Sequence, residues 1–135
     1  MARLSGQLGY PVAVQSLAVR LEGLLASEKE AVYVATASKG EVVGWVHGAE
    51  QLLVESGARC EILGLVVDEV VRRGGIGRQL VEAVEQWALA RGLGEVSVRS
   101  AINRAESHPF YRQVGYERVK SQHVYRKRLA AAGAA

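Results

Sequence analysis

The stretch Val66–Leu80, VVDEVVRRGGIGRQL, places arginines and glycines between an apolar run and a run with helical periodicity. The N-terminus of a helix leaves backbone N–H groups unpaired and carries about half a positive charge. Glycines there let the backbone approach a ligand closely, and arginines add charge and forked donors. We therefore interpret the stretch as an anion site, best suited to phosphate. The alternative is a glycine turn before a capped helix, with solvated arginines.

Two common phosphate-binding loops do not match this stretch. A P-loop requires Lys and then Ser or Thr after its last glycine, whereas Gly77 is followed by arginine and glutamine. A dinucleotide-binding loop requires G-x-G-x-x-G/A directly after a strand. Here Leu80 stands at the third small position, and Asp68–Gly74 separates the predicted strand from Gly75. Both interpretations are rejected.

The whole chain limits the possible classes of protein. Its 135 residues suit one domain, which we expect to span 1–135 with a core over 11–129 and a frayed tail over 130–135. A net charge of +3 is too small to argue for nucleic acid. No apolar run approaches the roughly 20 residues that span a membrane, and the N-terminus lacks a signal-peptide core. With Cys60 as the sole cysteine, we expect a cytoplasmic protein without nucleic-acid or membrane partners.

Hydrophobic periodicity and turn residues predict the order of the elements. The predicted elements are a helix over 11–27, strands over 31–37, 41–48 and 61–67, a helix over 75–91, a strand over 95–100, a short helix over 104–114, and closing strands over 116–120 and 123–129. The hairpins imply antiparallel pairing, and the strand–helix–strand passage over 61–100 implies one parallel step. We expect an α/β fold with a mixed, mostly antiparallel sheet and flanking helices.

A third loop pattern does match. The pattern R-x-x-G-x-G over 72–77, after a strand, resembles the acyl-CoA loop of the GCN5-related N-acetyltransferase (GNAT) family. The resemblance continues with Asn103 and with FYRQVGY over 110–116, and it covers about residues 31–129. It implies the acyl-CoA N-acyltransferase fold. The family opens with a strand and a full first helix, so we expect this chain to lack the first strand.

The resemblance also implies a site for acetyl-CoA. The predicted cofactor-binding residues are Leu65, Val66, Val67, Arg72, Arg73, Gly74, Gly75, Ile76, Gly77, Arg78, Asn103 and Tyr111. Backbone groups of the first three would hold the acetyl group and the pantetheine arm. The N–H groups of residues 73–78 would cradle the pyrophosphate, Asn103 would touch the pantetheine, and Tyr111 would lie near the thioester sulfur.

Acetyl transfer to an amine needs a deprotonated amine, a polarised carbonyl and a stabilised thiolate. The family motif and a phenol that stays protonated at neutral pH make Tyr111 the predicted general acid; the alternative is a ring that packs a helix. Glu61 is the predicted base if burial raises its pKa; the alternative is a solvated carboxylate. His47 is a weaker candidate for the base. The three histidines lack metal-ligand spacing, so no metal is expected.

These observations predict an enzyme that transfers an acetyl group from acetyl-CoA to a primary amine by direct attack. No histidine has a visible pairing with Cys60, so no acyl-enzyme is expected. One alternative is an acyl-CoA-binding regulatory module without catalysis, and another is a basic nucleic-acid-binding domain. We expect a small-molecule or peptide amine as acceptor, and the edge strands suggest a possible homodimer.

Overall fold

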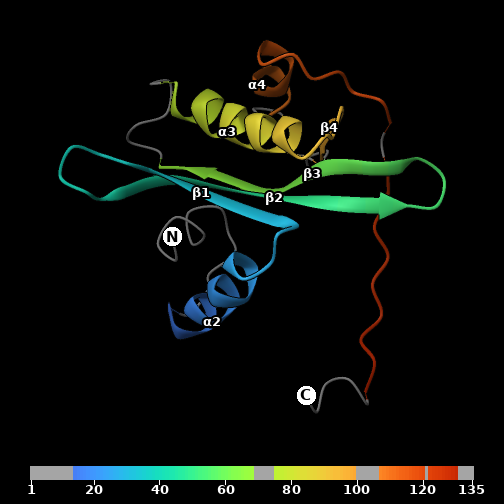
Figure 1. The fold of residues 1–135 in the computed structure, drawn as a ribbon, viewed down its shortest axis with the longest axis horizontal. Helices are drawn as coiled ribbons and strands as arrows, with labels where there is room; N and C mark the ends of the chain where they lie inside the picture. The colour runs from blue at the N-terminus through green and yellow to red at the C-terminus, as the bar shows by residue number, and fades with distance from the viewer. Residues whose placement is uncertain (1–13, 69–74, 100–106, 121, 131–135) are drawn as a thin grey trace. The chain divides into compact units, whose positions relative to one another are not determined.

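The computed structural model describes residues 14–68, 75–99, 107–120 and 122–130, and the chain divides into two compact units, 1–99 and 100–135. The elements of the first unit are α2 (Val14–Leu25), β1 (Glu30–Thr36), β2 (Val42–Leu53), β3 (Gly57–Val67), α3 (Ile76–Ala90) and β4 (Val96–Val98). The second unit contains α4 (Ser107–Gln113). Within the first unit, α2 and α3 lie on opposite sides of the sheet (Figure 1).

The sheet has the strand order β1-β2-β3-β4. The pairs β1–β2 and β2–β3 are antiparallel, and β3–β4 is parallel. Helix α3 makes the crossover that a parallel pair requires. The mixed, mostly antiparallel sheet predicted from the sequence is therefore confirmed.

The second hairpin is longer than predicted. The sequence suggested a break over 54–59, whereas β2 extends to Leu53 and β3 begins at Gly57, and these two residues are paired. Gly57 has a φ of 78°, a backbone conformation that glycine adopts without strain. It closes a three-residue loop of a common hairpin type. The break is therefore only a tight turn, and both strands continue up to it.

Helix α3 covers one face of the sheet closely because β2 has glycines beneath it. A Cβ added at Gly48 would lie 2.8 Å from Val84 Cγ1, and one added at Gly44 would lie 3.1 Å from Leu80 Cδ1. Both helix residues are buried, as the predicted apolar stripe requires. Residues 44 and 48 therefore face α3, and the alternation of the strand turns residues 45 and 47 to the opposite face of the sheet.

The second unit departs from the prediction after its helix. Gly115, with a φ of 96°, ends α4, and Tyr116 N donates to Tyr111 O at 2.9 Å. Beyond it, residues 116–120 and 122–129 contain no strand, so the two predicted closing strands are wrong. The large apolar side chains of these segments are exposed: Val119, Val124, Tyr125 and Leu129. A strand register needs one buried face to fix it, and these residues supply none.

Three other expectations concern residues outside the described part of the chain. The missing first strand concerns 1–13, and most of the predicted tail is 131–135. The first three residues of the predicted short helix, 104–106, also lie outside it.

Candidate functional site

The N-terminus of α3 has the features expected of an anion site. Gly75 is its N-cap, with φ 80° and ψ 5°, and no side chain caps the helix. The first turn contains no acidic residue. The first intrahelical bond runs from Gln79 N to Gly75 O at 3.0 Å. The amide N–H groups of the first turn, before Gln79, therefore have no acceptor within the helix. A Cβ added at Gly75 would meet no atom of the described residues within 4 Å.

Only part of the predicted loop can be assessed. Gly75, Ile76, Gly77 and Arg78 open the helix as predicted, and Ile76 and Gly77 are half-buried. Arg72, Arg73 and Gly74 lie outside the described residues, and so does Asn103.

Strand β3 offers an edge next to this helix. Its ladder with β4 pairs only Cys60, Glu61 and Ile62 with β4 residues. Among the described residues, the ladder ends before Leu65 and Val66, while their other side pairs with β2. The backbone edge predicted to hold an acyl chain therefore continues beyond β4, toward the segment that leads into α3.

Glu61 is buried and ion-paired. Its residue is 3% exposed, and its Oε1 lies 3.1 Å from Arg99 Nε. The side chain of Arg99 is 68% exposed, so the guanidinium reaches the carboxylate from the surface. The interpretation of Glu61 as a solvated strand-end carboxylate is wrong, because the side chain is buried and paired with an arginine.

His47 and Glu30 form a pair that the sequence analysis missed. His47 Nε2 lies 2.7 Å from Glu30 Oε2, and the side chains are 19% and 26% exposed. Glu30 is the first residue of β1, one residue before the predicted start of that strand. The sequence signal that could have included Glu30 is its spacing of two residues from Val32, because residues two apart on a strand lie on the same face.

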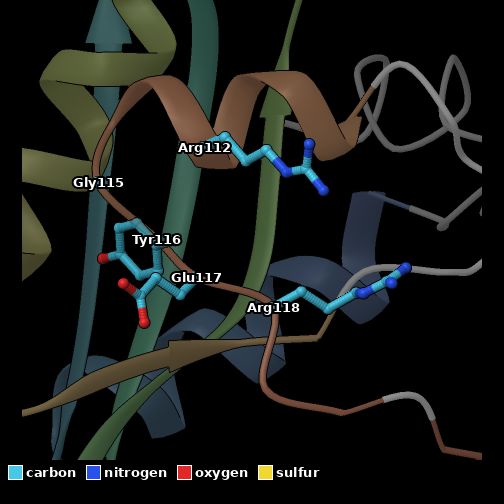
Figure 2. Close-up of a pocket in the computed structure, with 5 residues that line it drawn as sticks. All are labelled: Arg112, Gly115, Tyr116, Glu117 and Arg118. Carbon is cyan, nitrogen blue, oxygen red and sulfur yellow. The ribbon is translucent and has the colours of Figure 1, made fainter.

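Tyr111 lies within the second unit. Its ring centroid is 5.2 Å from that of Phe110 and 6.1 Å from that of Tyr116, both in edge-to-face arrangements. A shallow pocket of about 540 Å³ lies at the end of this helix. Its lining residues are Arg112, Gly115, Tyr116, Glu117 and Arg118 (Figure 2). The two arginine side chains extend to the same side in Figure 2, away from the ring of Tyr116 and the carboxylate of Glu117.

Cys60 is fully buried, and its thiol is not suited to act as a nucleophile. Burial raises the pKa of its thiol from 9.0 to about 11; a backbone hydrogen bond from Ala49 lowers it, and the charge of Glu61 raises it further. The thiolate is the reactive form of cysteine, so this side chain stays neutral and inert near pH 7.

Two classes of feature are not found in the described part of the chain. No group of three or more His, Cys, Asp or Glu side chains there is arranged to hold a metal ion. None of the helices described has both the length and the apolar character needed to cross a membrane.

Comparison with known proteins connects this geometry to a family. The model of the acetyltransferase (GNAT) family matches residues 7–116. The aminoglycoside N(6')-acetyltransferase type 1 of Klebsiella aerogenes is 30% identical over 102 residues, 73% of this chain and 67% of that protein. An uncharacterized N-acetyltransferase, YhdJ of Bacillus subtilis (strain 168), is 26% identical over 109 residues, 80% of this chain and 75% of that protein.

Solved structures show the same fold. AAC(6')-Iy in complex with the bisubstrate analog CoA-S-monomethyl-acetylneamine superposes with a TM-score of 0.84 at 22% identity, covering 95% of this chain and 89% of that one. The 6'-N-acetyltransferase AAC(6')-Ih from Acinetobacter baumannii gives 0.79 at 17% identity, covering 90% and 85%. Since the family model spans most of the sequence, the chain belongs to the acetyltransferase (GNAT) family and is an acetyltransferase.

Proposed function

We propose that this acetyltransferase moves the acetyl group of acetyl-CoA to a primary amine by direct attack. The observation that supports it most is the α3 N-terminus, where Gly75 leaves the first turn without a side-chain cap and without an acid. The relatives named as aminoglycoside N(6')-acetyltransferases act on amines by name, which supports an amine acceptor. Among small-molecule amines, amino sugars are the first class to test.

The described residues fit acetyl-CoA at two points. The open space around Gly75 leaves room for a diphosphate against the amides of Ile76 and Gly77. Leu65 and Val66, past the end of the β3–β4 ladder, have backbone groups suited to an amide-containing arm. We propose the same cofactor contacts for the rest of the predicted set: Val67, Arg72, Arg73, Gly74, Arg78, Asn103 and Tyr111. Bound acetyl-CoA supplies an activated acyl group as a thioester.

Two residues remain our proposals for the proton transfers. Tyr111 is the proposed general acid that protonates the leaving thiolate, as the family motif implies. Glu61 is the base predicted from the sequence, but its carboxylate is buried against Arg99. Glu61 would accept a proton only by giving up this ion pair. Neighbouring residues of the sheet are therefore also considered as the base.

We also propose where the reaction takes place and how the chains assemble. The single buried cysteine supports a reducing, cytoplasmic location. Pairing of two copies through an exposed sheet edge remains our proposal for a homodimer.

The proposed function is tested in two steps. Calorimetry with acetyl-CoA and with free CoA measures cofactor binding, and release of the CoA thiol measures transfer to a panel of amino sugars, polyamines, amino-acid amides and peptide N-termini. Tyr111→Phe should lose about a hundredfold or more in kcat because general acid catalysis is worth that much. The matched control, Tyr125→Phe, changes a 91% exposed ring and should leave kcat unchanged.

Three outcomes separate the alternatives. Acetyl-CoA binding with transfer that depends on Tyr111 supports the enzyme. Binding without transfer to any amine supports the regulatory module instead. A folded chain that binds neither acetyl-CoA nor CoA would refute both, because the α3 N-terminus would then have no diphosphate to hold.

A further inference from the structure

The sheet face opposite α3 carries a line of polar side chains from all four strands. Positions 44 and 48 of β2 face α3, so the alternation of the strand turns Trp45 and His47 to the other face. Glu61 pairs with Ala49, and Gly64 pairs with His47, so both belong to that same opposite face. Its polar members include Glu30, Trp45, His47, Gln51, Arg59, Glu61, Ser97 and Arg99.

The residue opposite His47 is a glycine, and the indole of Trp45 occupies the place of its side chain. Gly64 lies across from His47 on β3. The Trp45 ring lies over that glycine: a Cβ added there would be 2.7 Å from Trp45 Cζ3. The next residue on β3 is Leu65, which begins the stretch proposed to hold the acetyl group. The imidazole is therefore one ladder position away from the proposed acyl site.

Glu30 fixes the imidazole in a state suited to accepting a proton. At 2.7 Å, the carboxylate accepts the proton of His47 Nε2, so Nδ1 is left with its lone pair. When Nδ1 takes up a proton, the ring becomes positive, and the Glu30 carboxylate compensates that charge. Imidazole is also the side chain that ordinarily exchanges protons near neutral pH.

The same face contains polar atoms that lack partners. Ser97 Oγ, Trp45 Nε1 and Arg59 Nε are buried and make no hydrogen bond within the described residues. Buried polar groups are nearly always hydrogen-bonded, so these three atoms, spread over three strands, leave room for polar partners such as ordered water at this face. The indole N–H and the imidazole of His47 belong to β2, whereas the hydroxyl of Ser97 belongs to β4, on the other side of β3.

Other charged groups around His47 are engaged elsewhere or exposed. Glu61 is paired with Arg99. The titratable residues of α2, which packs on β1, and of the turn after it are Arg20, Glu22, Glu28 and Lys29, all exposed. Arg59 of β3 lies on the same face and is half-buried; among the described residues, Glu30 is the charged group within hydrogen-bond distance of the imidazole.

We infer that His47, positioned by Glu30, accepts the proton that the acceptor ammonium must lose before acetyl transfer, and that Glu61 and Arg99 tie β3 to β4. This rests on the proposed function. The ammonium gives one proton to His47 Nδ1, and the amine nitrogen attacks the thioester carbonyl. The C–N bond forms and the C–S bond breaks with its electron pair on sulfur. The thiolate takes a proton from the general acid, which the second amine proton restores, and His47 releases its own proton to solvent.

The test is the pH dependence of kcat/KM in four single variants. His47→Gln should lower kcat/KM by about a hundredfold at pH 7 and should recover toward pH 10, where the amine is itself deprotonated. Glu30→Gln should change the pH limb near neutrality with little change in KM for acetyl-CoA. Glu61→Gln separates the two candidate bases: the limb should persist in this variant if His47 is the base and vanish if Glu61 is the base. The matched control His123→Gln changes an exposed histidine and should match the wild type.

A second variant separates chemistry from structure. His47→Ala leaves a cavity where added imidazole can enter, so part of the lost rate should return with imidazole if the ring accepts the proton. Wild-type pH dependence in folded, active His47→Gln, or disappearance of the limb in Glu61→Gln alone, would overturn the inference while leaving the acetyltransferase intact. Failure of the wild type to transfer acetyl to any amine would instead refute the proposed function, and this inference with it.

Discussion

Replacing Gly75 by glutamate tests the α3 N-terminus as the seat of the diphosphate. The φ of 80° strains any L-residue by about 1–2 kcal/mol. No atom lies within 4 Å of the added Cβ, so no clash is added. A carboxylate at a helix N-terminus recovers about 0.3–1 kcal/mol from the helix dipole. The folded protein should therefore tolerate Gly75→Glu with a loss of about 1 kcal/mol.

Binding of CoA should respond much more strongly. Two unit negative charges about 5 Å apart repel by about 3 kcal/mol at an effective dielectric constant near 20. That repulsion corresponds to more than about a hundredfold weaker binding. Gly75→Gln provides the same size and strain without the charge, so the difference between the two variants isolates the electrostatic part.

Gly92 provides a matched control at the other end of the helix. It has a φ of 79° and, like Gly75, nothing within 4 Å of an added Cβ. Glutamate there faces the negative end of the dipole, so Gly92→Glu should be the less stable protein yet should bind CoA as the wild type does. Urea denaturation compares the stabilities of the two variants, and calorimetry compares their affinities for CoA. Unchanged CoA affinity in folded Gly75→Glu, or an equal loss in Gly92→Glu, would refute the reasoning.

Two further predictions concern packing and pH. Gly48→Ala forces a Cβ to 2.8 Å from the fully buried Val84 and should lower the free energy of unfolding by about 1–3 kcal/mol. The control Gly23→Ala, on exposed α2, should raise it by about 0.5–1 kcal/mol, both measured by urea denaturation. A gain in stability in both variants would contradict the close approach of α3. Burial raises the pKa of Cys60 to about 11, so the folded chain keeps a proton that the unfolded chain loses from pH 9. The unfolding free energy of the wild type, relative to Cys60→Ala, should therefore be constant below about pH 9 and fall by roughly 1 kcal/mol per pH unit up to pH 11; a constant difference would show a thiol in contact with solvent.

Local signals predicted much of the first unit. The apolar stripe of α3 and the glycine before it gave that helix nearly residue by residue, since periodicity and capping are properties of the helix itself. The β1–β2 hairpin followed from alternation and a glycine turn. The second turn was misread as a long break because Leu52 and Val54 are exposed there, so the alternation that marks a half-buried strand is lost.

The pairs of the candidate site were not predictable in the same way. Glu30 and His47 are 17 residues apart, and Glu61 meets Arg99 across a parallel ladder. Which charged side chains meet on a sheet depends on strand register, and register is decided by the packing of the whole face. The two closing strands failed for a related reason: residues 116–129 have strand-forming side chains, but their apolar groups have no buried face in the described structure.

The face with Glu61 and His47 owes its composition to one irregularity in β3. Glu61 and Gly64 are three residues apart, so an unbroken strand would turn them to opposite faces. The ladder shifts between His47 and Gly48, whose partners are Gly64 and Ile62, which leaves Leu63 as the extra residue of a bulge. The bulge returns Gly64 to the Glu61 face. It therefore places a glycine beneath the Trp45 ring and opposite His47, and the residues that follow it are those proposed to hold the acetyl group.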